Sequence, residues 1–223
     1  MKKTLNFLVF GLATVFALNV QAQESSWSTG ADFVSSYVWR GTKFGKGPAI
    51  QPSVEFSTGG FALGGWGNYN FTNDEEAGDA GEADLYASYS FDLSSTVALS
   101  FTMTDYYFPG SEYFDGTAHN FEPMVNLSIG NLSLTGAYMT NQSGDMDVSD
   151  TYLEAGYTAG PVNLFVGAGN GQYTDDGDFA LCNIGIGTSK EVKITDSFSL
   201  PVFGTVILNP SSEQLQIVVG FSL

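Results

Sequence analysis

The sequence predicts a transmembrane β-barrel of about twelve antiparallel strands, and three observations support this fold class. The N-terminus has the organisation of a cleaved export signal. Short segments that alternate between apolar and polar side chains follow along the whole chain, separated by Gly, Asn, Asp, Ser and Pro. The last segment, 214–223, alternates most cleanly and ends on its apolar face.

The N-terminal segment 1–22 is predicted to be a signal peptide. Lys2 and Lys3 form a basic start, residues 5–18 are mainly apolar, and Ala22 supplies a small residue at the cleavage position. The apolar run is shorter than the roughly 20 residues that a membrane-spanning helix needs. We therefore expect cleavage after Ala22, export from the cytoplasm, and a mature domain over 23–223.

Twelve alternating segments are predicted to be the strands. In chain order they are 29–40, 49–57, 61–71, 82–92, 96–106, 120–129, 132–140, 151–158, 162–169, 179–189, 198–208 and 214–223. In the fifth, for example, Val97, Leu99 and Phe101 alternate with Ala98 and Ser100. Most have the length of about nine to eleven residues that a tilted membrane strand needs. The pattern predicts an apolar outside and a polar lumen, although a soluble β-sandwich would alternate in the same way.

The connections between the predicted strands favour the barrel. Every second connection is short, as at 58–60, 93–95, 130–131 and 159–161, whereas 73–79 and 141–147 are long and acidic. Barrels place short turns in the periplasm and long loops outside. The connection 190–197 is the exception, because it belongs to the short series and is long. Many of the 27 glycines lie inside predicted strands, which fits the sharp coiling of a narrow barrel.

Aromatic residues are predicted to form two girdles at the membrane interfaces. Tyr37 and Trp39 share a parity near the outer end of the first predicted strand. The other predicted girdle residues are Tyr69, Phe71, Phe121 and Tyr138 at the outer end and Phe61, Tyr89, Phe91, Tyr157 and Phe221 at the inner end. Trp66 has the opposite parity and would point into the lumen unless Gly64 and Gly65 introduce a bulge.

The last predicted strand has one continuous apolar face. It is formed by Leu215, Ile217, Val219, Phe221 and Leu223, because successive side chains of a strand point to opposite faces. A last strand of this kind is typical of outer-membrane barrels, although their usual final residue is aromatic. The segment therefore predicts outer-membrane lipid and the barrel assembly machinery as partners.

Composition excludes several kinds of partner. The formal net charge is −17, and removal of the signal leaves five basic residues against twenty-four acidic ones, a net charge of −19. Nucleic acid is therefore not an expected partner. The single cysteine, Cys182, cannot form an internal disulfide, and it shares strand parity with Ile184 and Ile186. We expect it to be a small apolar residue that is buried or faces lipid.

The segment 31–71 resembles one known bacterial family, the TorF-type porins. The resemblance lies in an aromatic pair followed by Arg-Gly, a short loop with Pro-Ala, and a Gly-Phe turn that leads into a Gly-Trp strand. The residues that match the first part of this pattern are Tyr37, Trp39, Arg40, Gly41 and Pro48. The resemblance implies an outer-membrane barrel that passes small solutes, and it implies no catalytic residues.

Charged residues in the predicted lumen form the candidate site. By strand parity Arg40, Glu82, Asp84, Glu122 and Glu154 all point inward, in the outer half of their strands. A charge inside a narrow barrel is costly unless it is paired or hydrated. One interpretation is a closed, structural barrel rigidified by an Arg40–carboxylate network, with its acidic outer loops free to bind partners. The other is a narrow, monomeric channel for small solutes or ions in which the excess carboxylates favour cations.

Catalytic and metal sites are weakly indicated. The only histidine, His119, precedes the sixth predicted strand, and Ser111 is near it in sequence, but no hydrolase motif accompanies them, and a solvated loop histidine is the favoured interpretation. Two acidic runs could supply oxygen ligands for Ca²⁺. They contain Asp145, Asp147 and Asp150, and Asp175, Asp176 and Asp178. Neither matches an EF-hand loop, so solvated loops and no cofactor are expected.

Overall fold

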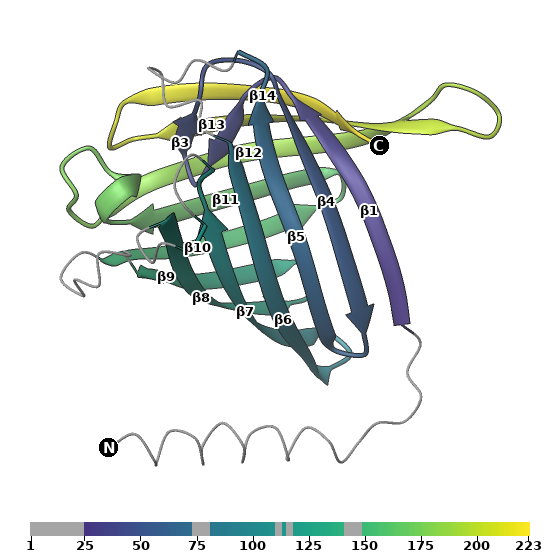
Figure 1. Ribbon diagram of the computed structural model, residues 1–223, viewed down its shortest axis with the longest axis horizontal. Helices are drawn as coiled ribbons and strands as arrows, with labels where there is room; N and C mark the ends of the chain where they lie inside the picture. The colour runs from purple at the N-terminus through teal and green to yellow at the C-terminus, as the bar shows by residue number, and fades with distance from the viewer. Residues whose placement is uncertain (1–24, 73–80, 110–112, 115–117, 141–148) are drawn as a thin grey trace.

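The computed structural model describes residues 25–72, 81–109, 113–114, 118–140 and 149–223 (Figure 1). The predicted signal peptide, both long acidic connections 73–79 and 141–147, and Ser111 lie outside the described residues.

Twelve strands close into one antiparallel barrel (Figure 1), which confirms the predicted fold class. The strands are β1 (Ser25–Val34), β4 (Ala49–Thr58), β5 (Phe61–Asn70), β6 (Glu82–Ser94), β7 (Val97–Tyr107), β8 (His119–Ile129), β9 (Leu132–Thr140), β10 (Ser149–Ala159), β11 (Val162–Gly169), β12 (Ala180–Lys193), β13 (Ser199–Asn209) and β14 (Gln214–Ser222). Neighbours along the chain pair with each other, and β1 closes the ring by pairing with both β4 and β14.

The predicted first strand, 29–40, is wrong in its second half. β1 ends at Val34, and a separate two-stranded hairpin follows, made of β2 (Tyr37–Trp39) and β3 (Thr42–Phe44). Trp39 pairs with Thr42, and the two residues between them have positive φ values, 49° at Arg40 and 84° at Gly41. A two-residue turn with both φ values positive is the tight connection that suits the twist of a hairpin. Tyr37, Trp39 and Arg40 are therefore not on a wall strand.

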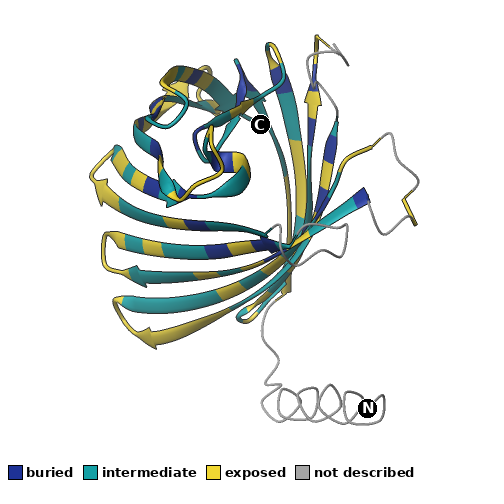
Figure 2. Cartoon of the chain, turned by 90° about the vertical axis from the view of Figure 1, so that its left-hand side faces the viewer, coloured by how far each residue is buried: buried dark blue, intermediate teal, exposed yellow. Residues whose placement is uncertain are grey.

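The outer face of the barrel is apolar, as the alternation predicted. Leu215 and Ile217 are each 63% exposed, and the predicted girdle residues Tyr69, Phe71 and Phe121 are about half exposed. The alternation appears as stripes along the strands in Figure 2. Buried polar residues, among them Asn68 and Glu122, occupy the alternate strand positions, whose side chains point into the lumen. In the part of the chain that the structure describes, no helix is long and apolar enough to span a membrane.

The inner face contains more apolar and aromatic side chains than a purely polar lumen would. Val34, Ala49, Ile207 and Val218 form one buried cluster there, and Ala137, Tyr152, Tyr173 and Cys182 form another. Several inward rings lie directly over glycines of the neighbouring strand. A Cβ added at Gly64 would lie 2.3 Å from the ring of Tyr86, and one at Gly185 would lie 2.1 Å from Phe165. The strand glycines therefore provide room for lumenal rings, in addition to allowing coiling.

Cys182 occupies a β-bulge between β11 and β12. Gly167 pairs with Asn183 and Ala168 pairs with Leu181, so Cys182 is the extra residue. The bulge removes Cys182 from the parity that it was expected to share with Ile184 and Ile186. Its side chain is fully buried within the second lumenal cluster.

The long connection at 190–197 is explained by an extended hairpin. β12 and β13 continue to pair with each other to Lys193 and Ser199, while the pairing of β12 with β11 stops at Thr188. Residues 188–199 are exposed on both faces, and Figure 1 shows this hairpin projecting beyond the neighbouring turns.

Candidate functional site

The β2–β3 hairpin, called the internal hairpin below, crosses the inside of the barrel. It starts from β1 and returns to β4, and its side chains contact inward-facing residues of β5, β7, β8 and β10. Strand β10 lies on the opposite side of the ring from β1 and β4. The internal hairpin therefore spans the lumen and narrows any passage through it.

Arg40, at the tip of the internal hairpin, is held by a two-pronged ion pair. Its Nη1 and Nη2 donate to the two carboxylate oxygens of Glu122, at 2.5 and 2.9 Å, and Nη1 also donates to the Tyr173 hydroxyl at 2.7 Å. The Arg40 side chain is 8% exposed and that of Glu122 is 1% exposed. The pair is therefore dry, which makes the planar fork of arginine well suited to this position.

Aromatic rings enclose the Arg40 guanidinium. Its central carbon lies 4.4 Å from the ring centroids of Trp39 and of Tyr152, and 5.5 Å from that of Tyr173. Tyr106 donates a hydrogen bond to the same Glu122 carboxylate at 3.1 Å. Burial raises the pKa of Tyr173, which lies in the turn before β12, so its hydroxyl remains protonated while it accepts the bond from Arg40. These rings exclude water from the ion pair.

The other predicted acids are inside the barrel but do not reach Arg40. Glu82 forms a hydrogen bond with the Tyr37 hydroxyl, and Asp84, 7% exposed, has one carboxylate oxygen without a hydrogen-bond partner among the described residues. Glu154 accepts hydrogen bonds from Tyr152 at 2.5 Å and from Asn183 at 2.9 Å. Of the predicted acids, the structure therefore brings only Glu122 into contact with Arg40.

The aromatic residues of this site were not predicted from the sequence to lie in the lumen. Tyr37 and Trp39 were predicted to be in the outer girdle, but Tyr37 packs on Trp66 at 5.5 Å and Trp39 packs on Tyr106 at 5.6 Å, both inside the lumen. The inward parity of Trp66 was the available signal, because it places a large ring in the lumen, where Tyr37 of the internal hairpin packs on it.

Gly41 lets the tip of the internal hairpin approach the wall at β12. A Cβ added there would lie 1.9 Å from the carbonyl oxygen of Cys182. We expect Gly41→Ala to displace the tip and to lower the thermal stability of the barrel more than Gly130→Ala does. Gly130 is the matched control, because it also has a positive φ, +57°, but has open space around it. Both changes introduce similar backbone strain, of about 1–2 kcal/mol, so the difference measures the contact with β12.

If the two variants unfold at the same temperature in detergent, the tip does not rest on β12. The comparison uses the temperature at which each barrel changes its mobility on a gel.

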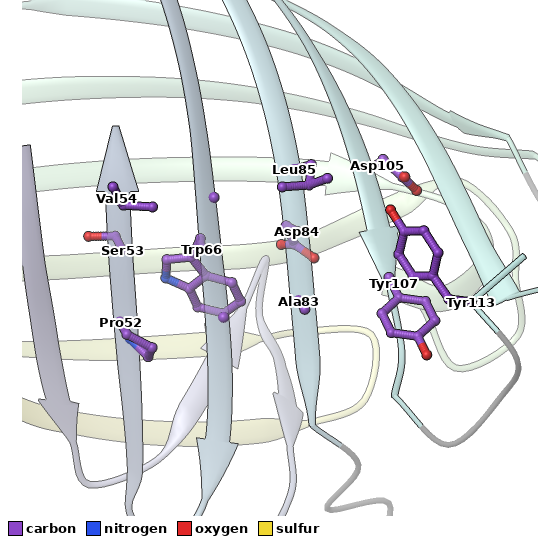
Figure 3. Close-up of a pocket in the computed structure, with 12 residues that line it drawn as sticks. Pro52, Ser53, Val54, Trp66, Ala83, Asp84, Leu85, Asp105, Tyr107 and Tyr113 are labelled. Carbon is purple, nitrogen blue, oxygen red and sulfur yellow. The ribbon is translucent and has the colours of Figure 1, made fainter. Parts of the chain in front are cut away.

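Two hollows differ in which side of the wall they occupy. A hollow of about 230 Å³ lies inside, between the internal hairpin and strands β1, β4, β5, β13 and β14. A larger one, of about 610 Å³, is shown in Figure 3. Most of its lining residues, such as Val54 and Leu85, have the outward parity, and it lies over Gly65, Gly67 and Ala83, where side chains are small or missing. It is therefore a depression in the apolar outer wall and not part of a passage.

His119 does not have a free ring nitrogen. Its Nδ1 lies 2.9 Å from an Asp105 carboxylate oxygen and its Nε2 lies 2.6 Å from the Tyr113 carbonyl oxygen. Both partners are acceptors, so both nitrogens donate, and neither is available to take a proton from a nucleophile. The side chains of His119 and Asp105 point to the outer face of the wall, because Asp105 lies directly opposite the exposed Phe121 on the neighbouring strand. Contrary to the sequence-based interpretation, His119 is the first residue of β8 and not a solvated loop residue.

Within the described segments, no group of three or more His, Cys, Asp or Glu residues is arranged to hold a metal ion. Of the predicted Ca²⁺ ligands, Asp145 and Asp147 lie outside the described residues. The backbone N–H of Asp175 donates to the Ser211 hydroxyl at 3.0 Å, and that of Asp178 donates to the Asp176 carboxylate at 3.1 Å.

Comparison of this structure with solved structures finds similar folds among porins. The KdgM porin is 13% identical, with a TM-score of 0.50, and the match covers 89% of this chain and 98% of that one. The KdgM porin in complex with disordered oligogalacturonate is 10% identical, with a TM-score of 0.47 and the same coverage. A mutant of Rh. blastica porin is 12% identical, with a TM-score of 0.40, covering 90% of this chain and 99% of that one. At such low identity the first match shows that the fold is porin-like, and the other two add no argument.

A search of the curated proteins gives no match. A family model does match residues 21–192, and its description reads "Bacterial protein of unknown function (Gcw_chp)". The model does not carry the TorF-type name that the motif around Arg40 suggested, so that relation stays a prediction. Because the match spans more than half of the chain, the protein belongs to the Gcw_chp family.

Proposed function

We propose that this protein is a monomeric outer-membrane barrel that passes small solutes along a narrow path beside the internal hairpin and prefers cations. The observation that carries the proposal is the position of the internal hairpin. A barrel closed only for structural reasons could fill its lumen with wall side chains, as small barrels do. Here a separate, charged segment crosses the lumen, as expected of a constriction.

Export and membrane insertion are parts of the same proposal. Residues 1–22 would direct export and be removed, the apolar outer face would contact lipid, and the alternating face of β14 would be recognised by the assembly machinery. The end with the short turns would then lie in the periplasm and the opposite end outside the cell. The proposal assigns no catalytic residue and no cofactor.

The preference for cations follows from the balance of charge in the lumen. Glu122 neutralises Arg40, and Lys43 and Lys46 are the other basic residues of the segment between β1 and β4. The other acids with inward parity include Asp32, Glu55, Glu82, Asp84 and Glu154. A negative field inside a low-dielectric wall concentrates counter-ions, so cations should pass more readily than anions.

Planar-bilayer recording tests the proposal. In a KCl gradient we expect conductance steps whose reversal potential has the sign of K⁺ preference, and we expect Asp84→Asn to reduce that preference. Glu191→Gln, in the exposed β12–β13 hairpin, removes one acidic charge outside the lumen and should leave the reversal potential unchanged. Anion preference would refute the charge argument. The absence of conductance steps would favour the competing function, a closed barrel that acts through its outer loops.

A further inference from the structure

The lumenal hollow beside the internal hairpin has the chemistry of a ligand site. Its volume is about 230 Å³, below the ~300 Å³ at which pockets for drug-sized ligands begin. It would therefore take a molecule of only a few non-hydrogen atoms.

One side of this hollow is polar and offers hydrogen-bond acceptors. Asp32 and Gln51 are directly opposite each other on β1 and β4. The Gln51 amide nitrogen donates to Asn68 at 3.1 Å, which leaves its carbonyl oxygen for another partner. Ser36 is 8% exposed, and its hydroxyl has no hydrogen-bond partner among the described residues. A buried hydroxyl without a partner is costly, so a ligand that bonds to it would remove that cost.

The other side is apolar and aromatic. Tyr37 and Trp66 have their ring centroids 5.5 Å apart and their planes inclined at 55°. Phe203 is a third ring, and Val34, Ile207 and Val218 belong to the first lumenal cluster. The hydroxyl of Tyr37 is fixed by its hydrogen bond to the Glu82 side chain, which does not line the hollow. Tyr37 is thus held in place independently of any ligand.

Charge decides which ligand these two sides fit. The described lining residues include one carboxylate, Asp32, and no basic side chain. A carboxylate next to aromatic faces attracts an ammonium group, because the ring faces are also negative in potential. We propose that the hollow binds a small organic cation, a compact alkylammonium whose charged end faces Asp32 and whose methyl groups contact Tyr37, Trp66 and Phe203. The site deepens the proposed function and rests on it, since it would be a binding site along the path that solutes take through the barrel.

Equilibrium binding to the folded barrel in detergent tests this site without requiring conduction. The probe is choline, and two compounds of nearly the same shape serve as references, the neutral 3,3-dimethylbutan-1-ol and the anionic 3,3-dimethylbutanoate. By titration calorimetry we expect choline to bind, the neutral compound to bind about tenfold more weakly, and the anion not to bind.

Two variants locate the binding. Asp32→Asn keeps the shape of the side chain and should weaken choline binding about tenfold, while leaving the weak binding of the neutral compound unchanged. Trp66→Leu should weaken both. Asp196→Asn, in the exposed turn of the β12–β13 hairpin, removes the same charge outside the barrel and should have no effect. The gel mobility of unheated samples confirms that each variant is folded.

The outcomes separate this inference from the proposed function. Choline binding that is equal in the wild type and in Asp32→Asn, or no choline binding at all, overturns the site even if the barrel conducts. Choline binding that depends on Asp32, in a barrel that shows no conductance steps, supports the site and overturns the channel.

Discussion

Replacement of Arg40 by alanine is expected to release the internal hairpin from the far wall of the barrel. The change leaves Glu122, 1% exposed, as a buried carboxylate that has lost its counter-ion. Breaking a buried pair by removing one partner costs about 3 kcal/mol or more, because the remaining charge is uncompensated. Trp39, Tyr152 and Tyr173 also lose the cation that they enclose. We therefore expect a lower unfolding temperature and, in bilayers, larger and noisier conductance steps.

Lys43→Ala is the control for this variant. It removes a positive charge from the same hairpin, but Lys43 is exposed and no ion pair of its side chain is seen among the described residues. It should leave the unfolding temperature unchanged. The double variant Arg40→Met with Glu122→Leu removes both charges and fills similar space, so it should recover most of the lost stability. Equal stability of Arg40→Ala and the wild type would show that the pair is hydrated and that the internal hairpin is not held by it.

The wall of the barrel could be predicted from the sequence because each wall strand has to satisfy two environments at once. An apolar outer face and a different inner face impose a period of two, and that period is visible without knowledge of the partners. Eleven of the twelve predicted strands therefore agree with the structure to within a few residues at their ends. The bulge at Cys182 breaks the period locally. It was not predicted because a single inserted residue leaves no recognisable pattern in the sequence.

The internal hairpin could not be predicted in the same way, because it has no lipid-facing side. The side chains of Tyr37, Val38 and Trp39 all pack on other protein side chains. In the sequence, the aromatic pair Tyr37 and Trp39 therefore cannot be distinguished from residues of a membrane girdle. The signal that was available is Arg40-Gly41, a two-residue turn between short strands rich in aromatic residues. Strand parity predicted that Arg40 points inward, and Arg40 does face Glu122, but from a turn and not from the end of a wall strand.

The residues that carry the resemblance to TorF-type porins are concentrated in this same segment. Tyr37, Trp39, Arg40 and Gly41 form β2 and its turn, and the carbonyl of Pro48 accepts a hydrogen bond from Phe71 where the segment returns to the wall. Each has a packing or backbone role in docking the segment inside the barrel. The motif is therefore best understood as the specification of a lumenal hairpin, and the function proposed here depends on what that hairpin restricts.

Removal of the internal hairpin is expected to have the largest effect on conduction. Ser35 forms backbone and side-chain hydrogen bonds with Val219, and Pro48 bonds to Phe71, so both ends of the segment are fixed to the wall. Since Val34 pairs with Ala49, residues 35 and 48 can be joined by a two-residue Asn-Gly turn that replaces 36–47. The wall ladder stays complete, so the barrel should still insert and remain resistant to detergent.

The shortened barrel should conduct several-fold more than the wild type, because the segment that crosses the lumen and narrows the passage is gone. Its cation preference should also rise, since Arg40, Lys43 and Lys46 are removed while the lumenal acids, Glu122 among them, stay on the wall. The control replaces 191–201 by Asn-Gly, which shortens the exposed β12–β13 hairpin between the paired residues Lys190 and Val202 and removes a similar length of chain. That variant should conduct as the wild type does. If the two variants have the same conductance and selectivity, the internal hairpin does not set the width of the passage, and the wall side chains alone must close or define it.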